Sequence, residues 1–399
     1  MPIIEVKDLT KVFGKNSKQA IELLDKGLTK EQILKETGAT VGVNRASFTV
    51  EEGEIFVIMG LSGSGKSTLV RLINRLIEPT QGSIYIDGED LSKMNKASLR
   101  NVRRKKLSMV FQKFGLFPHR TILENAAFGL EIQKMDKTKR KQKAKEALEL
   151  VGLGNYIDQY PGQLSGGMQQ RVGLARALTN DPKVLLMDEA FSALDPLIRK
   201  GMQDELIELQ SKMKKTILFI THDLDEALRL GDRIALMKDG NIVQIGTPEE
   251  ILVNPADAYV EKFVEDIDKS KVLTAQHIMK RPETVQIEKH GPRVALERMR
   301  EEGLSSILIT DKNRYLQGYV TADDALAATK NDISDLSEVL KTDIPKVEKD
   351  TALQEIFSII YDSQTPVAVV EDGKLLGIIV RGAVIAALAG EGEVKVEHA

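Results

Sequence analysis

The sequence predicts an α/β fold in two parts, a larger first domain with a mostly parallel sheet and a smaller second module. Short apolar runs at residues 55–59, 184–187 and 216–220 are separated by helical patterns, as in a parallel sheet that helices cover on both faces. From Lys271 onward, a pattern of helix, strand, strand and helix occurs twice. A chain of 399 residues also exceeds the usual size of one compact core, so at least two domains are expected.

The composition excludes several classes of function. With 56 Lys+Arg against 59 Asp+Glu, the net charge of −3 gives no electrostatic footprint for a nucleic-acid partner. The absence of cysteine excludes disulfides, thiolate metal sites and cysteine nucleophiles, and agrees with a reducing compartment. The N-terminal stretch is charged where a signal peptide is apolar, and no stretch approaches the roughly 18 apolar residues of a membrane span. We therefore expect a cytoplasmic location.

The first elements predict a small antiparallel sheet with a helical insertion. Strand patterns occur at residues 3–6, 46–50 and 84–86, the last followed by an Asp87-Gly88 turn. Residues 16–40 show helical spacing, and Thr29 with Gln32 forms the pattern of a capping box. This segment is therefore expected to be a short helical insertion between two strands.

The rest of the first domain, residues 1–265, is expected to be helix-rich around the parallel sheet. A helix is expected over residues 69–76, and a helical subdomain over about 115–165, with 140–151 as its clearest helix. The basic run 134–145 is expected to be a solvated helix face. A hairpin through Asp239-Gly240 and helices within 248–264 complete the domain, and residues 266–271 are expected to be a linker.

The strand at residues 55–59 runs directly into Gly60-Leu-Ser-Gly-Ser-Gly-Lys-Ser-Thr68, a complete P-loop followed by a helical pattern. In a P-loop, backbone N–H groups cradle phosphate, Lys66 reaches the β- and γ-phosphates, and the Ser67 hydroxyl ligates Mg²⁺. The residues expected to contact the phosphates are Gly60, Ser62, Gly63, Ser64, Gly65, Lys66, Ser67 and Thr68.

Two further motifs extend this site. Asp188 and Glu189 end an apolar strand, which suits Asp188 for holding Mg²⁺ through water and Glu189 for orienting and deprotonating an attacking water. Ser165, Gly166 and Gly167 begin a helical run, where backbone N–H groups bind anions and no side chain blocks close approach.

The P-loop, the later Leu-Ser-Gly-Gly and the Asp-Glu strand, in this order, resemble the ATP-binding cassette (ABC) family. This resemblance implies a RecA-like core with an antiparallel β subdomain and a helical subdomain. It also implies roles for residues that match the remaining family motifs. Gln112 matches the Q-loop glutamine that links Mg²⁺ to the membrane partner, residues 192–195 match the D-loop, and His222 matches the switch histidine that contacts the γ-phosphate. His119 and His277 have no such setting and are expected to be surface or packing residues.

The resemblance therefore implies a full set of site residues. The catalytic set is Glu189, His222, Gln112 and Lys66; the Mg²⁺ set is Ser67, Gln112 and Asp188; further ATP contacts are Ser165, Gly166, Gly167, Gln169 and Asp195. Phe13 resembles the aromatic residue that stacks on adenine, with a buried core phenylalanine as the alternative. Because each ATP in this family lies between the P-loop of one subunit and the Leu-Ser-Gly-Gly of another, a homodimer or a pair with a similar subunit is implied.

Several segments closely resemble the ATP-binding subunits of glycine betaine and proline betaine importers. These segments are the insertion before Val41, residues 53–66, residues 74–79 and residues 114–119. The resemblance implies a peripheral subunit on the cytoplasmic face of the membrane, which hydrolyses ATP with Mg²⁺ to drive uptake through a permease. Two alternatives remain: an importer for another small solute, and a soluble ABC ATPase with a nucleotide sensor.

The second part repeats at roughly 60 residues, and Gly318 and Gly377 occupy equivalent places in the two copies. Its first copy predicts strands at 306–310 and 316–320 between helices at 294–299 and 323–328. The second copy predicts strands at 366–370 and 376–380 between helices at 353–360 and 383–388. The repeat resembles a tandem pair of cystathionine β-synthase (CBS) domains at 272–330 and 335–390, followed by a tail at 391–399.

The first copy has a polar pair that commonly holds ribose in nucleotide-binding CBS domains, Thr321 and Asp324. The second copy has Val380 in place of the threonine and no carboxylate in place of the aspartate, while Arg381 remains able to contact a phosphate. The candidate regulatory residues are Thr321, Asp324, Ile378, Val380 and Arg381. Family analogy implies cyclic di-AMP as the ligand, against a purely structural dimerisation module. Activation by ionic strength, through screening of charges facing anionic lipid, is a further expectation.

Overall fold

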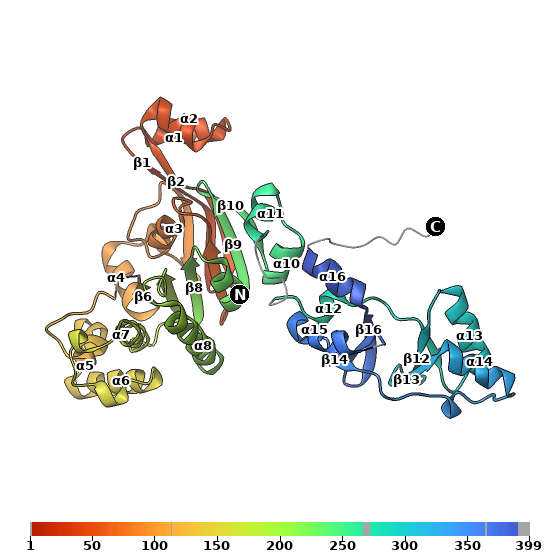
Figure 1. Cartoon of the computed structure of the whole chain (residues 1–399). Coiled ribbons are helices and arrows are strands. Elements are labelled where there is room, and N and C mark those ends of the chain that lie inside the picture. The colour runs from red at the N-terminus through yellow and green to blue at the C-terminus, as the bar shows by residue number, and fades with distance from the viewer. Residues whose placement is uncertain (1, 113, 266–271, 364, 390–399) are drawn as a thin grey trace. The chain divides into compact units, whose positions relative to one another are not determined.

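The computed structural model describes the chain except for residues 1, 113, 266–271, 364 and 390–399 (Figure 1). It divides into two compact units, Met1–Val264 and Glu265–Ala399, and each is described by itself. The expected linker at 266–271 and tail at 391–399 lie outside the described residues. No helix in the described part is both long enough and apolar enough to cross a membrane.

An antiparallel sheet forms the first layer of the first unit, as the sequence predicted. Its strand order is β2-β1-β4-β5. The strands are β1 (Ile4–Phe13), β2 (Thr40–Val50), β4 (Gln81–Ile86) and β5 (Glu89–Asp90). Asp87 and Gly88 connect β4 to β5 with φ values of 52° and 74°, the left-handed pair that a tight hairpin turn requires.

The core sheet of the first unit has the order β10-β9-β3-β8-β7-β6. Its strands are β3 (Ile55–Met59), β6 (Leu107–Phe111), β7 (Val184–Asp188), β8 (Thr216–Thr221), β9 (Arg233–Lys238) and β10 (Asn241–Gly246). All residues of β3 and β8 are buried, and one core packs these strands against α3 and the antiparallel sheet. Strands β3, β7 and β8 run parallel in register, so their carboxyl ends lie at one edge of the sheet.

Helices surround this sheet and also form a separate helical cluster of α5, α6 and α7. The helices are α3 (Lys66–Ile73), α4 (Lys96–Lys105), α5 (Ile122–Ile132), α6 (Lys137–Leu150), α7 (Gly166–Leu178), α8 (Pro196–Met213), α9 (Leu224–Leu230), α10 (Pro248–Val253) and α11 (Ala258–Val264). The prediction of a helix over 69–76 was wrong at both ends. Gly65 is the left-handed N-cap of α3, so the helix starts at Lys66, inside the P-loop.

The helical insertion consists of α1 (Ser17–Asp25) and α2 (Lys30–Thr37), which Figure 1 shows at the ends of β1 and β2. The Thr29–Gln32 capping box is confirmed, and Gly38 ends α2 in the left-handed conformation. A small separate core holds the two helices against the strands. It contains Val12, Ala20, Ile33, Ala39 and Val41.

The second unit contains the two predicted copies. The first is α13 (Pro292–Glu301), β12 (Ser306–Thr310), β13 (Leu316–Thr321) and α14 (Ala322–Lys330). The second is α15 (Leu353–Asp362), β15 (Val367–Glu371), β16 (Lys374–Ile379) and α16 (Arg381–Ala389). Each sheet also has a short parallel strand that the sequence analysis missed, β11 (Thr284–Gln286) or β14 (Lys346–Glu348). Three residues are too few to show a strand period.

The two copies exchange the segments that precede them. Leu273 and the short helix α12 (Ala275–Ile278) lie in the core of the second copy, while Leu336 lies in the core of the first. The packing units therefore differ from the predicted repeats 272–330 and 335–390 at their N-terminal ends. A sequence repeat records order along the chain, whereas the exchange depends on how the chain crosses in space.

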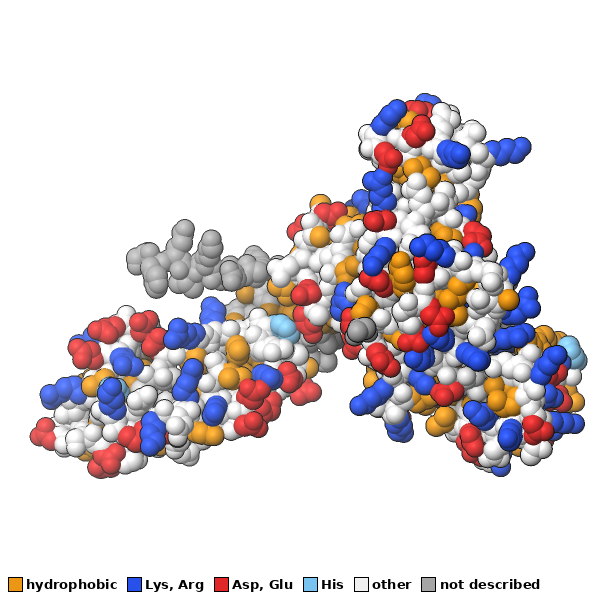
Figure 2. All heavy atoms as spheres, turned by 180° about the vertical axis from the view of Figure 1, so that it is seen from behind, with side chains coloured by type: hydrophobic (Ala, Val, Ile, Leu, Met, Phe, Trp, Pro, Cys, Tyr) orange, Lys and Arg blue, Asp and Glu red, His pale blue; other side chains and the backbone are white. Residues whose placement is uncertain are grey.

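Charged side chains of both signs are interspersed over the face of the molecule in Figure 2. Ion pairs also join segments of the first unit that are distant in the sequence. Asp87 accepts hydrogen bonds from Lys106 at 2.6 Å and from Lys183 at 2.9 Å, which lowers the pKa of its carboxyl. This connects the β4–β5 turn of the antiparallel sheet to the core sheet.

We predict that Gly318→Ala destabilises the second unit. A Cβ at this position would lie 2.1 Å from the Lys341 backbone carbonyl oxygen, in a segment that crosses from the second copy. Relieving this overlap requires the backbone to move, at a cost of about 2 kcal/mol or more. Thermal unfolding of the full chain is expected to show a lower midpoint for this unit. Gly382→Ala is the matched control because a Cβ there meets nothing within 4 Å; an equal loss in both variants would refute the close-approach explanation.

Candidate functional site

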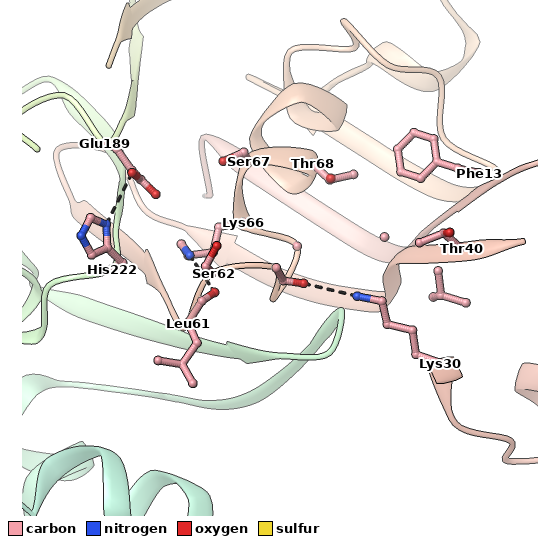
Figure 3. A pocket seen from close by; sticks show the side chains of 14 residues that line it. Phe13, Lys30, Thr40, Leu61, Ser62, Lys66, Ser67, Thr68, Glu189 and His222 are labelled. Atoms are coloured by element: carbon pink, nitrogen blue, oxygen red, sulfur yellow. Dashed lines mark hydrogen bonds and ion pairs between the residues drawn. The ribbon is translucent and has the colours of Figure 1, made fainter. Parts of the chain in front are cut away.

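A pocket of about 560 Å³ lies at the carboxyl edge of the core sheet (Figure 3). One side is formed by the P-loop, together with Glu189 and His222, and the other by residues at the base of the helical insertion. The lining residues are Phe13, Lys30, Thr40, Val41, Gly42, Leu61, Ser62, Gly63, Gly65, Lys66, Ser67, Thr68, Glu189 and His222. The pocket therefore collects most of the predicted phosphate-binding residues. It also contains Lys30, Thr40 and Gly42, which the sequence analysis did not assign.

The path of the P-loop requires glycine at two close approaches. A Cβ on Gly60 would lie 2.2 Å from the Met237 carbonyl oxygen, and one on Gly65 would lie 2.3 Å from the Gly42 carbonyl oxygen. Both glycines also have positive φ values, 149° and 107°. The loop is thus held between β9 and β2, with its backbone close to both strands.

Lys66 has its ammonium group inside the loop. Its Nζ donates to the carbonyl oxygens of Gly60 at 2.8 Å and Leu61 at 3.1 Å. Burial lowers the pKa of Lys66, and the negative charges of Glu189 and Asp188 act in the opposite direction. These contacts hold a cation in the loop, where it is suited to neutralise phosphate oxygens.

Ser67 and Asp188 lie together at the floor of the site. The Ser67 hydroxyl donates to Asp188 Oδ1 at 3.3 Å. Burial raises the pKa of the Asp188 carboxyl, while the nearby positive charge of Arg71 lowers it. A hydroxyl oxygen beside a partly buried carboxylate matches the hard oxygen ligands that Mg²⁺ prefers, so these residues fit the metal that the P-loop motif implies.

Glu189, His222 and Gln112 meet at the ends of neighbouring strands. Glu189 Oε2 lies 3.4 Å from His222 Nδ1 and accepts a hydrogen bond from Gln112 Nε2 at 3.4 Å. Gln112 Nε2 also donates to Ser192 Oγ at 3.1 Å. Glu189 has a left-handed backbone with φ of 47°, and its N–H donates to the Ile220 carbonyl at 3.0 Å. Its conformation is fixed by the turn after β7.

A buried carboxylate behind His222 was not predicted. Glu226, in the first turn of α9, accepts hydrogen bonds from the hydroxyl of Thr221 and, at 3.1 Å, from Gln203 Nε2. Burial raises its pKa, and these hydrogen bonds oppose the rise. The network braces the turn that carries His222. Its sequence signal was only an acidic residue near a helix start, which is common in helices that have no such role.

Five of the expected ATP contacts belong to segments outside the P-loop and do not line the pocket. These residues are Ser165, Gly166, Gly167, Gln169 and Asp195. The Ser165 hydroxyl caps α7 by accepting from Met168 N–H at 3.3 Å, and Gln169 Nε2 donates to the Leu164 carbonyl at 3.1 Å. Asp195 is the exposed residue before α8. Within one chain, these residues therefore lie apart from the phosphate loop. Ser64 and Gly60 also fall outside the lining set, although both belong to the loop.

Phe13 is a wall of the pocket and is 39% exposed, so the alternative of a core phenylalanine was wrong. It is the last residue of β1, where the chain leaves the sheet for the insertion. Gly42 makes room for the ring, since a Cβ there would lie 2.7 Å from Phe13 Cε2.

In the first CBS copy, Thr321 and Asp324 form a local hydrogen-bonded pair. The Thr321 hydroxyl donates to the Asp324 carboxylate and accepts from its backbone N–H at 3.2 Å. Lys341 Nζ lies 2.6 Å from Asp324 Oδ2, and this hydrogen bond lowers the pKa of the Asp324 carboxyl. The pair thus already has protein partners, as the N-cap of α14.

In the second CBS copy, Arg381 donates to the carbonyl oxygens at the end of α15. Its Nε lies 3.2 Å from the Ile360 oxygen, and its Nη2 lies 3.1 Å from Tyr361 and 2.8 Å from Ser363. This is a structural role that the sequence analysis did not assign. Val380 is half-buried, and the backbone of Ile378 pairs with Lys280.

Comparisons with known proteins agree with this arrangement. Residues 43–192 match the ABC transporter family model, and residues 275–331 and 336–390 match the CBS domain model. The glycine betaine transport ATP-binding protein OpuAA of Bacillus subtilis is 65% identical, over 98% of this chain and 93% of the relative. The glycine betaine/carnitine transport ATP-binding protein GbuA of Listeria monocytogenes is 63% identical, over 98% of both chains.

More distant relatives extend the comparison. The glycine betaine/proline betaine transport ATP-binding protein ProV of Escherichia coli is 50% identical, over 98% of both chains. Among solved structures, the dimeric post-hydrolysis state of the ATP-binding cassette MJ0796 bound to ADP and Pi is 32% identical. It has a TM-score of 0.52 and covers 61% of this chain and 98% of its own. From its motifs, its pocket and these relatives, the chain belongs to the ATP-binding subunits of glycine betaine-type ABC transporters, ATPases coupled to transport that carry tandem CBS domains.

Proposed function

We propose that this chain hydrolyses ATP to drive uptake of glycine betaine or a related quaternary-ammonium osmoprotectant through a membrane permease. The observation that carries the proposal is the near full-length similarity, at 63–65% identity, to ATP-binding proteins named for glycine betaine transport. In this proposal, other components of the transporter bind the substrate, and this chain supplies the energy by hydrolysing ATP. An importer for another small solute remains the second candidate, because a relative at 40% identity is named for carnitine and choline as well.

In this proposal, the pocket holds ATP with adenine against Phe13 and the phosphates in the P-loop. The N–H groups of the loop and Lys66 bind the phosphates, and Ser67, Asp188 and Gln112 hold Mg²⁺. Bound at these residues, Mg²⁺ would supply positive charge to offset the charge that develops on the phosphate oxygens. Glu189 accepts a proton from the attacking water, and His222 contacts the γ-phosphate and holds the Glu189 carboxylate in position.

A second copy of the chain is proposed to complete the site. The residues that lie apart from the pocket would then contact the ATP held by the partner: Ser165, Gly166, Gly167, Gln169 and Asp195. The first N–H groups of an α-helix have no acceptor within the helix; at α7 the Ser165 hydroxyl accepts from that of Met168, and groups of this kind bind anions. The dimeric state named for the cassette MJ0796 supports a homodimer. As a peripheral subunit on the cytoplasmic face, the dimer would close on ATP and reopen after hydrolysis, moving the permease between two states.

We predict that Glu189→Gln binds ATP with near wild-type affinity but turns it over about a hundredfold more slowly, or worse. The amide fills the same space but cannot accept the proton of the attacking water. Single-turnover hydrolysis and equilibrium binding of Mg-ATP measure the two effects separately. Glu208→Gln on α8, an exposed carboxylate paired with Lys212, is the control and should keep wild-type rates. Wild-type turnover by Glu189→Gln would exclude Glu189 as the base.

We also predict that glycine betaine stimulates ATP hydrolysis by this chain when it is reconstituted in liposomes with its permease and substrate-binding component. Stimulation is expected because substrate binding favours the permease state in which the two cassettes close on ATP. Hydrolysis rate is measured with and without the solute, and choline and carnitine are compared under the same conditions. A constant rate with all three solutes would leave the ATPase in place and reject this substrate class.

The CBS module is proposed to regulate this activity through ionic strength, cyclic di-AMP or both. Charges on the module that face anionic lipid interact within a Debye length of about 8 Å at cellular salt, so added salt weakens the attraction. For cyclic di-AMP, Thr321 and Asp324 would exchange their present hydrogen bond for bonds to ribose, and Lys341, which now pairs with Asp324, would supply a cation for phosphate.

We predict that removal of the second unit abolishes salt activation in the liposome assay while ATP hydrolysis continues. The first unit, Met1–Val264, has its own cores and holds every residue of the pocket. Hydrolysis is measured against KCl concentration for the full and shortened chains, with and without cyclic di-AMP. If salt activation persists in the shortened chain, the module is not the salt sensor; if cyclic di-AMP leaves the full chain unchanged, the nucleotide proposal fails.

A further inference from the structure

The helical insertion connects the ends of two strands that line the pocket. Phe13 ends β1 and Thr40 begins β2, and these two residues are paired across the sheet. Both line the pocket, and α1 and α2 occupy the chain between them. The insertion is therefore placed beside the bound nucleotide by the strand pair itself, whatever further role it has.

The second insertion helix has a fixed position. Its first turn is closed by the Thr29–Gln32 capping box, and its last by Gly38. The fully buried side chain of Ile33 anchors it in the small core with Ala20 and Val41. Such a helix presents its first residue from a stable support, as a binding residue requires.

That first residue is Lys30, and its side chain reaches into the pocket (Figure 3). Its Nζ donates to the Gly63 carbonyl oxygen of the P-loop at 3.3 Å. Within the described residues, no carboxylate forms an ion pair with Lys30, and this carbonyl is its hydrogen-bond partner. An ammonium group has three N–H donors, so two remain for another acceptor.

Lys66, the other cation at the loop, has different hydrogen-bond partners from Lys30. Lys66 donates to Gly60 and Leu61 from inside the loop, whereas Lys30 approaches Gly63 from the insertion. Two ammonium groups on different elements thus contact one phosphate-binding loop. The phosphate oxygens carry most of the negative charge of a nucleotide. They are therefore the acceptors that a second ammonium group at this loop would bind.

We propose that Lys30 is a nucleotide-binding residue, whose ammonium group binds an oxygen of the phosphate chain and fastens the helical insertion over the bound nucleotide. The proposal rests on the assignment of the pocket to ATP. It gives the insertion a function in ATP affinity. It places no chemical step on Lys30, so the effect should appear in binding rather than in turnover.

The test uses the full chain and three variants. Lys30→Ala removes the ammonium group, Lys30→Arg keeps a positive charge, and Lys35→Ala removes an exposed lysine from the same helix. Affinities for Mg-ATP and for adenosine are measured at equilibrium, and KM and kcat are measured in the reconstituted transporter. Thermal unfolding checks that each variant is folded; alanine is a good helix former at this position.

We expect Lys30→Ala to raise the Kd and KM for Mg-ATP by about five- to tenfold with kcat within twofold, the size of one charge-assisted hydrogen bond at a partly exposed site. The affinity for adenosine should not change, because adenosine has no phosphate. Lys30→Arg should recover most of the loss, and Lys35→Ala should match the wild type.

Four results would overturn the proposal. An unchanged Mg-ATP affinity in Lys30→Ala would show that the ammonium group does not bind nucleotide. An equal loss of affinity for adenosine in Lys30→Ala would show that Lys30 acts on the base or the ribose and not on the phosphates. A fall in kcat alone would indicate a role in turnover instead of binding. A lower unfolding midpoint that Lys30→Arg shares would indicate a structural role. Failure of the wild type and Lys35→Ala to bind ATP would instead reject the assignment of the pocket.

Discussion

The parallel register of β3, β7 and β8 is the constraint on which the ATP site depends. Met59 pairs with Thr221, and Asp188 pairs with Ile220, so the three strands end side by side. The next residues along the chain are the P-loop, Glu189 and His222. A shift of one residue in this register would move these groups and turn each strand's side chains to the opposite face. Backbone hydrogen bonding between the strands thus brings together site residues that are far apart in the sequence.

The P-loop is further held from outside the parallel strands. Gly240, in the turn between β9 and β10, donates its N–H to the Ser64 carbonyl at 2.9 Å and accepts from Asn44 N–H at 2.8 Å. The loop, the hairpin turn and β2 therefore form one hydrogen-bonded group. Since β2 also carries the base of the helical insertion, the insertion and the phosphate loop share a support, which is the physical basis for a role of Lys30 in binding.

The second unit is built on a different principle, the exchange of segments between two similar copies. Lys341 pairs with Tyr319, and Lys280 pairs with Ile378, so each copy receives a backbone segment that belongs to the other in sequence. A shared core between the copies includes Leu308, Tyr319, Ala368 and Ile378. Because of this pairing and the shared core, unfolding of either copy would break contacts in the other, so we regard the two copies as one structural module.

The sequence by itself determined what depends on near neighbours along the chain: the P-loop, the Asp188–Glu189 strand end, the Thr29–Gln32 capping box and most strands. These features follow from spacing and local hydrogen bonding, which a sequence displays directly. The tertiary structure alone decided that Lys30 contacts Gly63, that Arg381 is engaged by the end of α15, and that α12 packs in the second copy. Such contacts join segments whose separation in sequence has no period, so they depend on the path of the folded backbone.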